Sequence, residues 1–295
     1  MEHQTKVVVI ANQKGGVAKT TTSVNLAAYL ASVGKPTLLI DLDPQGNATS
    51  GCGLDRENLP KSVYHALIGE ESLENVIQQS PAVTGLFVAP SDISLVGAEI
   101  ELVSTEARER CLQRALSQIA STNKYEFIII DTPPSLGLLT LNALTAAHSV
   151  IIPMQCEYYA LEGLAQLYKT ISLVRQNLNS DLQIEGLVFS MVDQRANLTQ
   201  QVIDEVRKFL KDKVYSTVIP RNIRLAEAPS HGKPIFSYDK TSRGAEAYTQ
   251  LGLEFLSRQR GGEPVTPAAQ QTDSASPEQT APPLSDQPTP QEVTQ

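Results

Sequence analysis

Short apolar runs recur along this chain, and longer stretches with helical periodicity separate them. Most of these runs are apolar without alternation, which is typical of strands that are covered on both faces of a sheet. The predicted strands cover residues 6–10, 37–41, 86–89, 127–131, 150–152, 186–189 and 214–219, and the clearest amphipathic helices cover residues 21–33, 159–178 and 198–210. This order predicts an α/β fold with a doubly wound, mostly parallel sheet of about seven strands and helices on both faces.

The composition changes sharply near the end of the 295-residue chain. Residues 261–295 contain seven of the 18 prolines and five acidic residues, but no lysine or arginine. Such a segment buries too little apolar surface to offset the entropy lost on ordering, so we expect one folded domain at residues 1–260 and a disordered, acidic Pro/Gln/Thr-rich tail at 261–295. The tail holds −5 of the net charge of −8, which leaves −3 for residues 1–260. A globally basic nucleic-acid binder is therefore excluded, whereas a local basic patch is not.

Several other classes of protein do not fit the sequence. No run approaches the ~20 apolar residues needed to cross a bilayer, and the first residues lack the layout of a signal peptide. Cys52, Cys111 and Cys156 lie far apart, which argues against a zinc knuckle or a disulfide framework. We expect a cytoplasmic protein that does not act on a membrane.

A glycine-containing loop joins the first predicted strand to the first predicted helix. Residues 11–21 read Ala-Asn-Gln-Lys-Gly-Gly-Val-Ala-Lys-Thr-Thr. Glycines let backbone N–H groups converge on a phosphate, and the N-terminus of the following helix adds a partial positive charge. Lys19 is placed to reach the β- and γ-phosphates, and the Thr20 hydroxyl to bind Mg²⁺. The residues expected to contact a nucleotide here are Lys14, Gly15, Gly16, Val17, Ala18, Lys19, Thr20 and Thr21.

This loop departs from the standard G-x-x-x-x-G-K-[ST] pattern at two positions, because Gln13 and Ala18 stand where glycines are expected. If position 18 requires a positive φ, alanine there costs roughly 1 kcal/mol. The alternative reading of the loop is an ordinary glycine-rich turn between a strand and a helix.

Acidic residues end two of the predicted strands. Asp41 and Asp43 follow the second strand and, by alternation, lie on the same side of it. Asp131 ends the apolar run at residues 127–131, which is the Walker B arrangement. Carboxylates gathered at strand ends are costly unless they meet Mg²⁺ or hydrogen-bond water, and we expect Thr20 and Asp131 to bind Mg²⁺ here. Asp43 has the alternative role of capping a turn.

These motifs together resemble the deviant Walker A ATPases of the ParA/MinD family, and most closely the short ParA/Soj type that partitions chromosomes. The resemblance covers residues 6–258 and is carried by Lys14-Gly-Gly-x-x-Lys-Thr, by Asp-Leu-Asp-Pro-Gln at 41–45, by residues 155–163, and by the stretch from Val214 to Pro234. It implies a P-loop NTPase-like fold in which Lys14 crosses a dimer interface to the nucleotide of the partner subunit.

The resemblance also assigns roles to individual residues. Asp43 positions or activates the attacking water, so the catalytic set is Lys14, Lys19 and Asp43, and Asp41 supports the metal shell. Pro220 and Asn222 lie against the nucleotide base. The nucleotide contacts also include Met191 and Asp193, which match the family pattern.

Basic residues gather in the second half of the chain. Family ParA dimers bind double-stranded DNA without sequence preference, which requires only phosphate contacts. On this resemblance the DNA-binding residues are Arg195, Arg221, Arg224 and Lys233. The alternative is that these are solvated surface charges, partly paired with Glu227, Asp239 and Glu246.

The function expected from this sequence is a Mg²⁺-dependent ATPase that drives chromosome or plasmid partition. It would hydrolyse ATP to ADP and phosphate, form a homodimer on ATP, associate with the nucleoid, and be stimulated by a ParB-type centromere-binding protein. Only five residues precede the first strand, which disfavours an added operator-binding domain.

Three other functions are weighed against this one. The first alternative is a MinD-like spatial regulator acting on a membrane or a protein cargo, which needs a C-terminal amphipathic helix that the acidic tail does not provide. An electron-transfer ATPase needs paired cluster-ligating cysteines. A nucleotide-locked assembly protein that hardly hydrolyses ATP is disfavoured by Asp43.

Overall fold

The computed structural model describes residues 5–120, 122–157, 160–193, 195 and 197–261. The tail that the sequence predicts as disordered therefore lies outside the described residues, apart from Gly261. The last described helix ends at Gln259.

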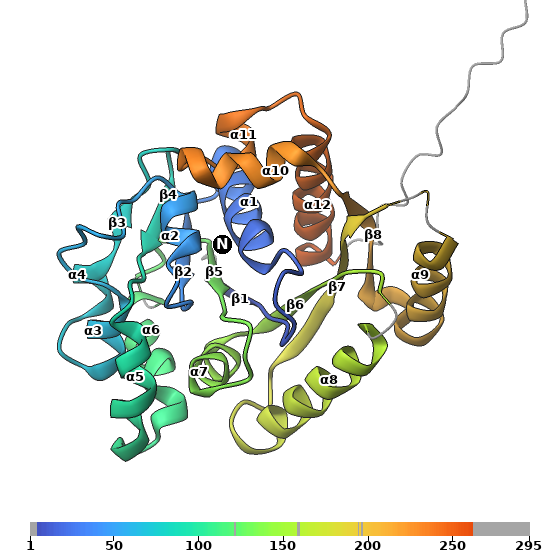
Figure 1. Cartoon of the computed structure of the whole chain (residues 1–295). Helices are drawn as coiled ribbons and strands as arrows, with labels where there is room; N and C mark the ends of the chain where they lie inside the picture. Colours follow the sequence, from blue (N-terminus) through green and yellow to red (C-terminus); the bar gives the residue numbers. More distant parts are fainter. Residues whose placement is uncertain (1–4, 121, 158–159, 194, 196, 262–295) are drawn as a thin grey trace, which may run out of the picture. The chain divides into compact units, whose positions relative to one another are not determined.

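The described strands form one sheet in which every neighbouring pair but one is parallel (Figure 1). The strand order is β3-β4-β2-β5-β1-β6-β7-β8. In chain order the strands are β1 (Lys6–Ile10), β2 (Thr37–Asp41), β3 (Gln78–Gln79), β4 (Leu86–Ala89), β5 (Phe127–Asp131), β6 (Ser149–Met154), β7 (Gln183–Val192) and β8 (Val214–Pro220).

The strand count is eight rather than the predicted seven or so, because β3 was not expected. This strand has only two residues, Gln78 and Gln79, and pairs antiparallel with β4 at the edge of the sheet. Its side chains are polar, so it leaves no apolar run in the sequence. The other seven strands lie where the apolar runs predict them.

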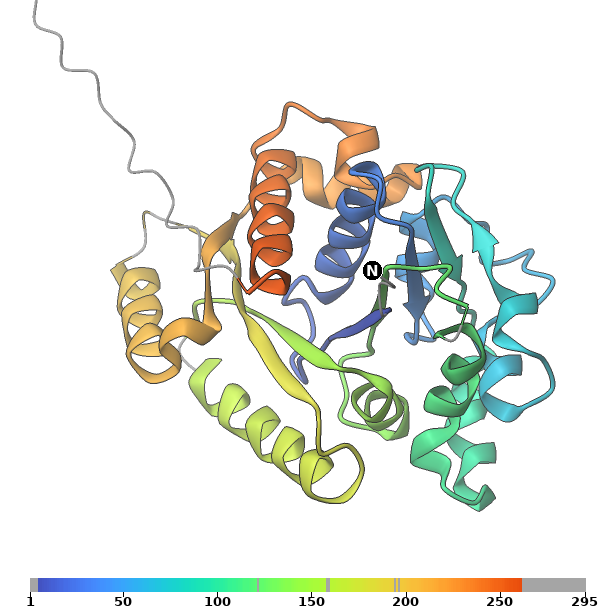
Figure 2. The ribbon, with the colours of Figure 1, turned by 180° about the vertical axis from the view of Figure 1, so that it is seen from behind.

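Helices cover both faces of the sheet, as the front and back views show (Figures 1 and 2). One face carries α1 (Lys19–Ser32), α2 (Asn47–Gly51), α10 (Ile223–Glu227), α11 (Ile235–Tyr238) and α12 (Arg243–Gln259). The other carries α3 (Val63–Ile68), α4 (Leu73–Val76), α5 (Leu95–Glu101), α6 (Cys111–Ala120), α7 (Leu138–Ala146), α8 (Ala160–Asn177) and α9 (Asn197–Leu210). The doubly wound α/β prediction is confirmed.

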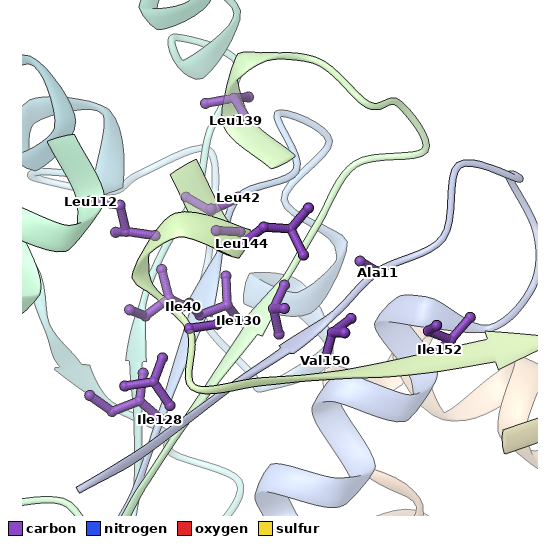
Figure 3. Packing of buried hydrophobic residues seen from close by; sticks show 14 of the residues in the cluster. Ala11, Ile40, Leu42, Leu112, Ile128, Ile130, Leu139, Leu144, Val150 and Ile152 are labelled. Carbon is purple, nitrogen blue, oxygen red and sulfur yellow. The ribbon is translucent and has the colours of Figure 1, made fainter. Parts of the chain in front are cut away.

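Alternating strand residues supply the two cores. Val7 and Val9 face the layer that holds α7 and α8, whereas Val8 and Ile10 face α1 and α12. Figure 3 shows the first of these cores, in which strand residues such as Ile130 and Val150 pack near Leu144 of α7. The packing is mainly aliphatic, as a chain with 5% aromatic residues requires. Burial on both faces explains why the strands lack polar alternation.

The edge strand β8 is held by a buried glutamate from α12. Glu254, only 3% exposed, accepts hydrogen bonds from the backbone N–H groups of Ser216 and Thr217 at 2.8 and 2.9 Å. Arg258 pairs with Glu254 at 2.9 Å and stacks over the ring of Tyr215. These contacts occupy donors of β8 that would otherwise be open to another strand.

The topology also indicates where a ligand binds. β1 lies between β5 and β6, so the strand order reverses at β1. In open α/β sheets, ligands bind beyond the carboxyl ends of the strands at such a switch point. Within the described ranges, the helices are all too short or too polar to cross a bilayer.

His148, the residue before β6, is hydrogen-bonded to β1 and allows the stability of the sheet to be tested. The Nδ1 atom of His148 accepts a hydrogen bond from the backbone N–H of Val7 at 2.9 Å, and the backbone N–H of His148 donates to the Val7 carbonyl. Burial lowers the pKa of His148, and nearby Lys6 lowers it further. The neutral ring therefore stabilises the fold above the unfolded pKa of about 6.5, and this stabilisation is lost as the pH falls towards the folded pKa.

We expect His148→Asn, which does not titrate, to show a weaker loss of stability on acidification than the wild type. The free energy of unfolding, measured by urea denaturation from pH 7.5 to 5, should converge for the two proteins as the pH falls. A constant difference across this range would contradict the assignment.

Candidate active site

The loop after β1 has the backbone geometry of an anion cradle. It leads directly into α1, and two of its residues have left-handed conformations, Gly16 with φ 74° and Ala18 with φ 64°. Among the described residues, no acceptor is bonded to the backbone N–H groups from Gly15 to Thr21. Unpaired N–H groups at a helix N-terminus are donors for a phosphate.

Side chains from the adjoining strand ends hold the carbonyl oxygens of this loop. Ser190 donates to the Val17 carbonyl at 2.9 Å, and Gln155 donates to the Gly16 carbonyl at 2.8 Å. These bonds fix the loop from the β6 and β7 side without using its N–H groups. The sequence gives no signal for Ser190 in this role, whereas Gln155 belongs to the stretch at 155–163 that carries the family resemblance.

Lys19 is the buried cation of the site. Its side chain is 6% exposed, and its ammonium donates to the Lys14 carbonyl at 3.0 Å. Burial lowers the pKa of Lys19, and the nearby carboxylates of Asp131 and Asp43 act in the opposite direction. The lysine thus lies between the loop and the acidic strand ends.

Asp41 and Asp131 lie side by side at the carboxyl ends of the sheet. They are register partners on β2 and β5, and both are fully buried. Burial raises the pKa of both carboxyls. The Asp41 carboxylate raises the pKa of Asp131 further, whereas the charge that adds to the rise at Asp41 is that of Asp43. Neither forms an ion pair with a lysine or arginine in the described part of the chain.

Hydroxyl groups of α1 satisfy Asp131. Thr20 and Ser23 donate to its two oxygens, each at 2.8 Å. Asp41 instead accepts from the backbone N–H and the hydroxyl of Thr49, both at 2.8 Å. Sequence reasoning missed Ser23 and Thr49. The spacing of three between Thr20 and Ser23, which puts both on one face of α1, is the signal that identifies Ser23.

This donor set fits Mg²⁺. No cluster of three His, Cys, Asp or Glu residues suited to a metal occurs within the described residues. Mg²⁺ does not need such a cluster, because it is usually held by one or two carboxylates together with phosphate oxygens and water. Thr20 and Asp131 offer a hydroxyl and a carboxylate in contact, whereas both oxygens of Asp41 already accept hydrogen bonds, one from Thr49 and the other from the backbone N–H of Asp43.

Asp43 caps a turn and also faces the site. One carboxylate oxygen accepts from the backbone N–H of Gln45 at 3.0 Å, so the turn-capping alternative describes part of its role. Its backbone N–H donates to Asp41 at 3.1 Å, and its carbonyl accepts from Ser91 at 2.8 Å. The side chain is fixed and 8% exposed, with its second oxygen free of hydrogen bonds to described residues.

Lys14 is ion-paired within its own subunit. Its ammonium contacts the Glu157 carboxylate, and the two side chains are 41% and 53% exposed. A second lysine beside Lys19 is therefore neutralised by Glu157, a residue that sequence reasoning quoted but gave no role.

The strand ends of β7 and β8 bring the remaining nucleotide candidates together. Val192 pairs with Pro220, and the N–H of Arg221 donates to the Val192 carbonyl at 3.2 Å. Met191 has a φ of 50°, and its sulfur accepts from Gln155, which also bonds the phosphate loop. Asn222 caps α10 by accepting from the N–H of Arg224 at 2.9 Å.

The DNA candidates are all exposed, but they differ in their partners. Arg224 pairs with Glu227 at 2.9 Å and Asp239 at 3.5 Å, so the alternative of paired surface charges describes this residue. Arg221, Arg195 and Lys233 form no ion pair with the described residues. The backbone N–H of Arg195 donates to the Asp193 carboxylate at 3.1 Å. A residue expected to bind DNA therefore contacts one expected to bind the nucleotide.

Comparison with known proteins identifies a family. A family model described as an AAA domain matches residues 5–184. The chain is 58% identical over 249 residues to the sporulation initiation inhibitor protein Soj of Bacillus subtilis, covering 84% of this chain and 97% of that protein. It is 50% identical over 253 residues to the chromosome-partitioning ATPase Soj of Treponema pallidum, covering 86% and 98% respectively.

A solved structure extends the comparison to bound ligands. The structure described as cobyrinic acid a,c-diamide synthase from Mycobacterium smegmatis, with a bound ATP analogue and magnesium, superposes with a TM-score of 0.76. It is 38% identical in sequence, and the match covers 88% of this chain and 98% of that chain.

The positive φ of Ala18 generates a prediction. Ala18→Gly should raise the free energy of unfolding by about 1 kcal/mol, because glycine adopts this conformation without the Cβ penalty. Thermal unfolding without nucleotide measures this change. Ala107, with a φ of 51° in a loop outside the site, is the matched control. Ala107→Gly should raise stability in the same way, but only Ala18→Gly should alter ADP affinity. A loss of stability in Ala18→Gly would be inconsistent with the strain assigned to this residue.

Proposed function

Because this chain belongs to the Soj/ParA family of chromosome-partitioning ATPases, within the AAA domain family, we propose that it segregates DNA through an ATP-driven switch. The chain is an ATP hydrolase that works with ATP and Mg²⁺. In the proposed cycle, ATP drives a homodimer that binds double-stranded DNA without sequence preference. A ParB-type centromere-binding protein stimulates hydrolysis and so releases the dimer. The protein acts in the cytoplasm, at the nucleoid.

The single observation that carries this proposal is the composition of the phosphate cradle. Unpaired N–H groups from Gly15 to Thr21 lie beside the buried ammonium of Lys19. Thr20 lies in contact with the buried carboxylate of Asp131. Donors for phosphate oxygens and ligands for a divalent cation therefore occur together at the switch point of the sheet.

The chemistry follows from the positions of these groups. Lys19 and the N-terminus of α1 stabilise negative charge on the transferred phosphoryl group. Thr20 and Asp131 would hold Mg²⁺, which neutralises charge on the phosphate oxygens. Asp43 keeps one oxygen for the attacking water while Gln45 fixes the other. Asp41 fixes this arrangement by accepting from the N–H of Asp43.

The proposed dimer depends on Lys14. Its ammonium is neutralised by Glu157 at an exposed position, where an ion pair is worth only about 0–1 kcal/mol. The phosphates of a nucleotide on a facing subunit offer more negative charge than one carboxylate. Lys14 can therefore exchange Glu157 for the partner's nucleotide at little cost.

The proposed DNA surface lies beside the nucleotide candidates in sequence and in space. Arg221 lies between Pro220 and Asn222, and Arg195 is bonded to Asp193. Together with Arg224 and Lys233, these residues supply the positive charge that phosphate contacts need. Residues 194 and 196, next to Arg195, lie outside the described residues.

Lys14 provides a direct test of the dimer. We expect Lys14→Ala to bind ADP with near wild-type affinity, because the loop N–H groups and Lys19 remain, but to form no dimer with ATP. Light scattering with ATP and equilibrium ADP binding measure the two properties. Lys35→Ala, which removes the half-buried ion pair with Glu126 away from the loop, is the control and should dimerise normally. An ATP dimer of Lys14→Ala would refute its proposed role.

DNA binding can be tested with the hydrolysis-deficient variant Asp43→Ala. Co-sedimentation with DNA should occur with ATP and not with ADP, and it should weaken as salt rises because phosphate contacts release counterions. Adding Arg221→Ala should reduce the log–log salt slope by about 1, the contribution of one phosphate contact. Retention with neither nucleotide would remove DNA from the proposed function while leaving the ATPase intact.

A further inference from the structure

Exposed aliphatic side chains are concentrated on one short segment of the molecule. Of the nine large hydrophobic residues that are exposed in the described part of the chain, four lie between residues 93 and 103. They are Ile93, Val96, Ile100 and Val103, with exposed fractions of 68, 49, 73 and 60%. Val96 and Ile100 lie on one side of α5, Ile93 lies in the turn before it, and Val103 lies in the following 3-10 turn, Leu102–Ser104; the spacings of three, four and three residues continue the same side. We refer to these four residues as the α5 stripe.

The α5 stripe is not needed for the core. Leu95, Ala98 and Leu102 on the opposite side of the same segment are buried and already attach it to the sheet. β-Branched residues are also poor helix formers, so Ile and Val at exposed helical positions bring no local advantage. Contiguous exposed apolar residues on a folded protein mark an interaction surface.

The charge around the α5 stripe is negative. Asp92, Glu99, Glu101 and Glu106 lie in this segment, and no lysine or arginine occurs from residue 91 to 107. None of these four carboxylates forms an ion pair with the described residues. At the far end, Arg108 donates to the Val103 carbonyl, but its charge is paired with Glu109.

The negative charge around the α5 stripe determines which kind of partner can bind there. DNA and anionic lipid surfaces are both repelled by the four carboxylates. The chain's own tail from residue 261 is acidic and has no basic residue, so it is repelled as well. A second copy that met this surface through its own α5 stripe would bring carboxylates against carboxylates. A cationic amphipathic segment of another protein matches both the apolar stripe and its acidic border.

The segment that carries the α5 stripe contacts two loops of the active site, the loop that contains Asp43 and the loop that follows Asp131. Ser91, just before Ile93, donates to the carbonyl of Asp43 at 2.8 Å. Glu99 lies against the backbone of Gly137, where a side chain on the glycine would collide with its carboxylate. Gly137 ends the loop that begins after Asp131, so displacement of α5 acts on the Asp43 loop and on the loop after β5.

We propose that the α5 stripe is the docking surface for a cationic amphipathic segment of the partner protein that stimulates ATP hydrolysis. This inference rests on the proposed function, because it assigns a site on this chain to the ParB-type partner. Binding buries the aliphatic side chains, and the segment's positive charges pair with the carboxylates. The two loop contacts transmit the binding to Asp43 and to the loop after Asp131.

The test uses the full chain and the purified ParB-type protein encoded in the same genome. Ile93→Ser combined with Ile100→Ser should weaken partner binding by at least about tenfold, given the area these side chains bury, and should abolish stimulation. Hydrolysis without the partner, the ATP dimer and DNA retention should not change. Leu173→Ser combined with Leu253→Ser, at exposed positions of α8 and α12, is the matched control and should be stimulated normally.

A second variant tests the charge. Glu106→Lys should weaken partner binding and reduce its salt dependence, whereas Glu205→Lys, at an exposed position of α9, should do neither. Normal stimulation of the serine double variant would overturn the proposal, and loss of its ATP dimer would reassign the surface to contacts between copies. Absence of any effect of the partner on the wild type would remove the partner from the proposed function and this site with it. Intact ATP-dependent DNA retention would distinguish that result from failure of the whole proposed function.

Discussion

The arrangement of this active site depends on two carboxylates that the sheet forces together. Asp41 and Asp131 end neighbouring parallel strands in the same register, and both are fully buried. Two buried negative charges side by side are unfavourable, so the surrounding structure supplies hydrogen-bond donors on both sides. Thr20 and Ser23 come from the first turns of α1, and Thr49 comes from α2. The same requirement fixes where α1 begins, and therefore where the phosphate loop ends.

In the phosphate loop, the carbonyl oxygens are hydrogen-bonded within the protein, whereas the N–H groups are available to a ligand. Its carbonyl oxygens are bonded by Ser190, Gln155 and Lys19, all from the protein. Its N–H groups from Gly15 to Thr21 have no acceptor among the described residues. A ligand with several negatively charged oxygens satisfies these donors and Lys19 together, which a neutral ligand does not. The position of Ala18 in the left-handed region shows that this geometry is kept in spite of backbone strain.

Much of this could be predicted from the sequence, because the dominant signals are local. Apolar runs identified seven strands, and the Gly-rich loop with Lys19 and Thr20 identified the cradle. β3 was missed because two glutamines pair through their backbone, which has no side-chain signal. Ser190 and Glu157 were missed as functional groups because their partners, Val17 and Lys14, lie far away in sequence. Thr49 is close to Asp41 in sequence, but its contact depends on how α2 lies against the end of β2. Sequence reasoning places a residue at a strand end, but only the fold decides which other strand end it faces.

The second half of the chain connects two surfaces that have separate roles in the proposed function. Pro220 and Asn222, the base candidates, flank Arg221, and Asn222 accepts a hydrogen bond from the backbone of Arg224. A nucleotide that moves Asn222 therefore also moves the start of α10, on which Arg224 is carried. Arg224 is held by Glu227 and Asp239, and such exposed pairs are weak enough to be exchanged for a phosphate. In the proposed function, coupling between nucleotide state and DNA affinity would then need no distant relay, because the capping residue Asn222 would take part in both surfaces.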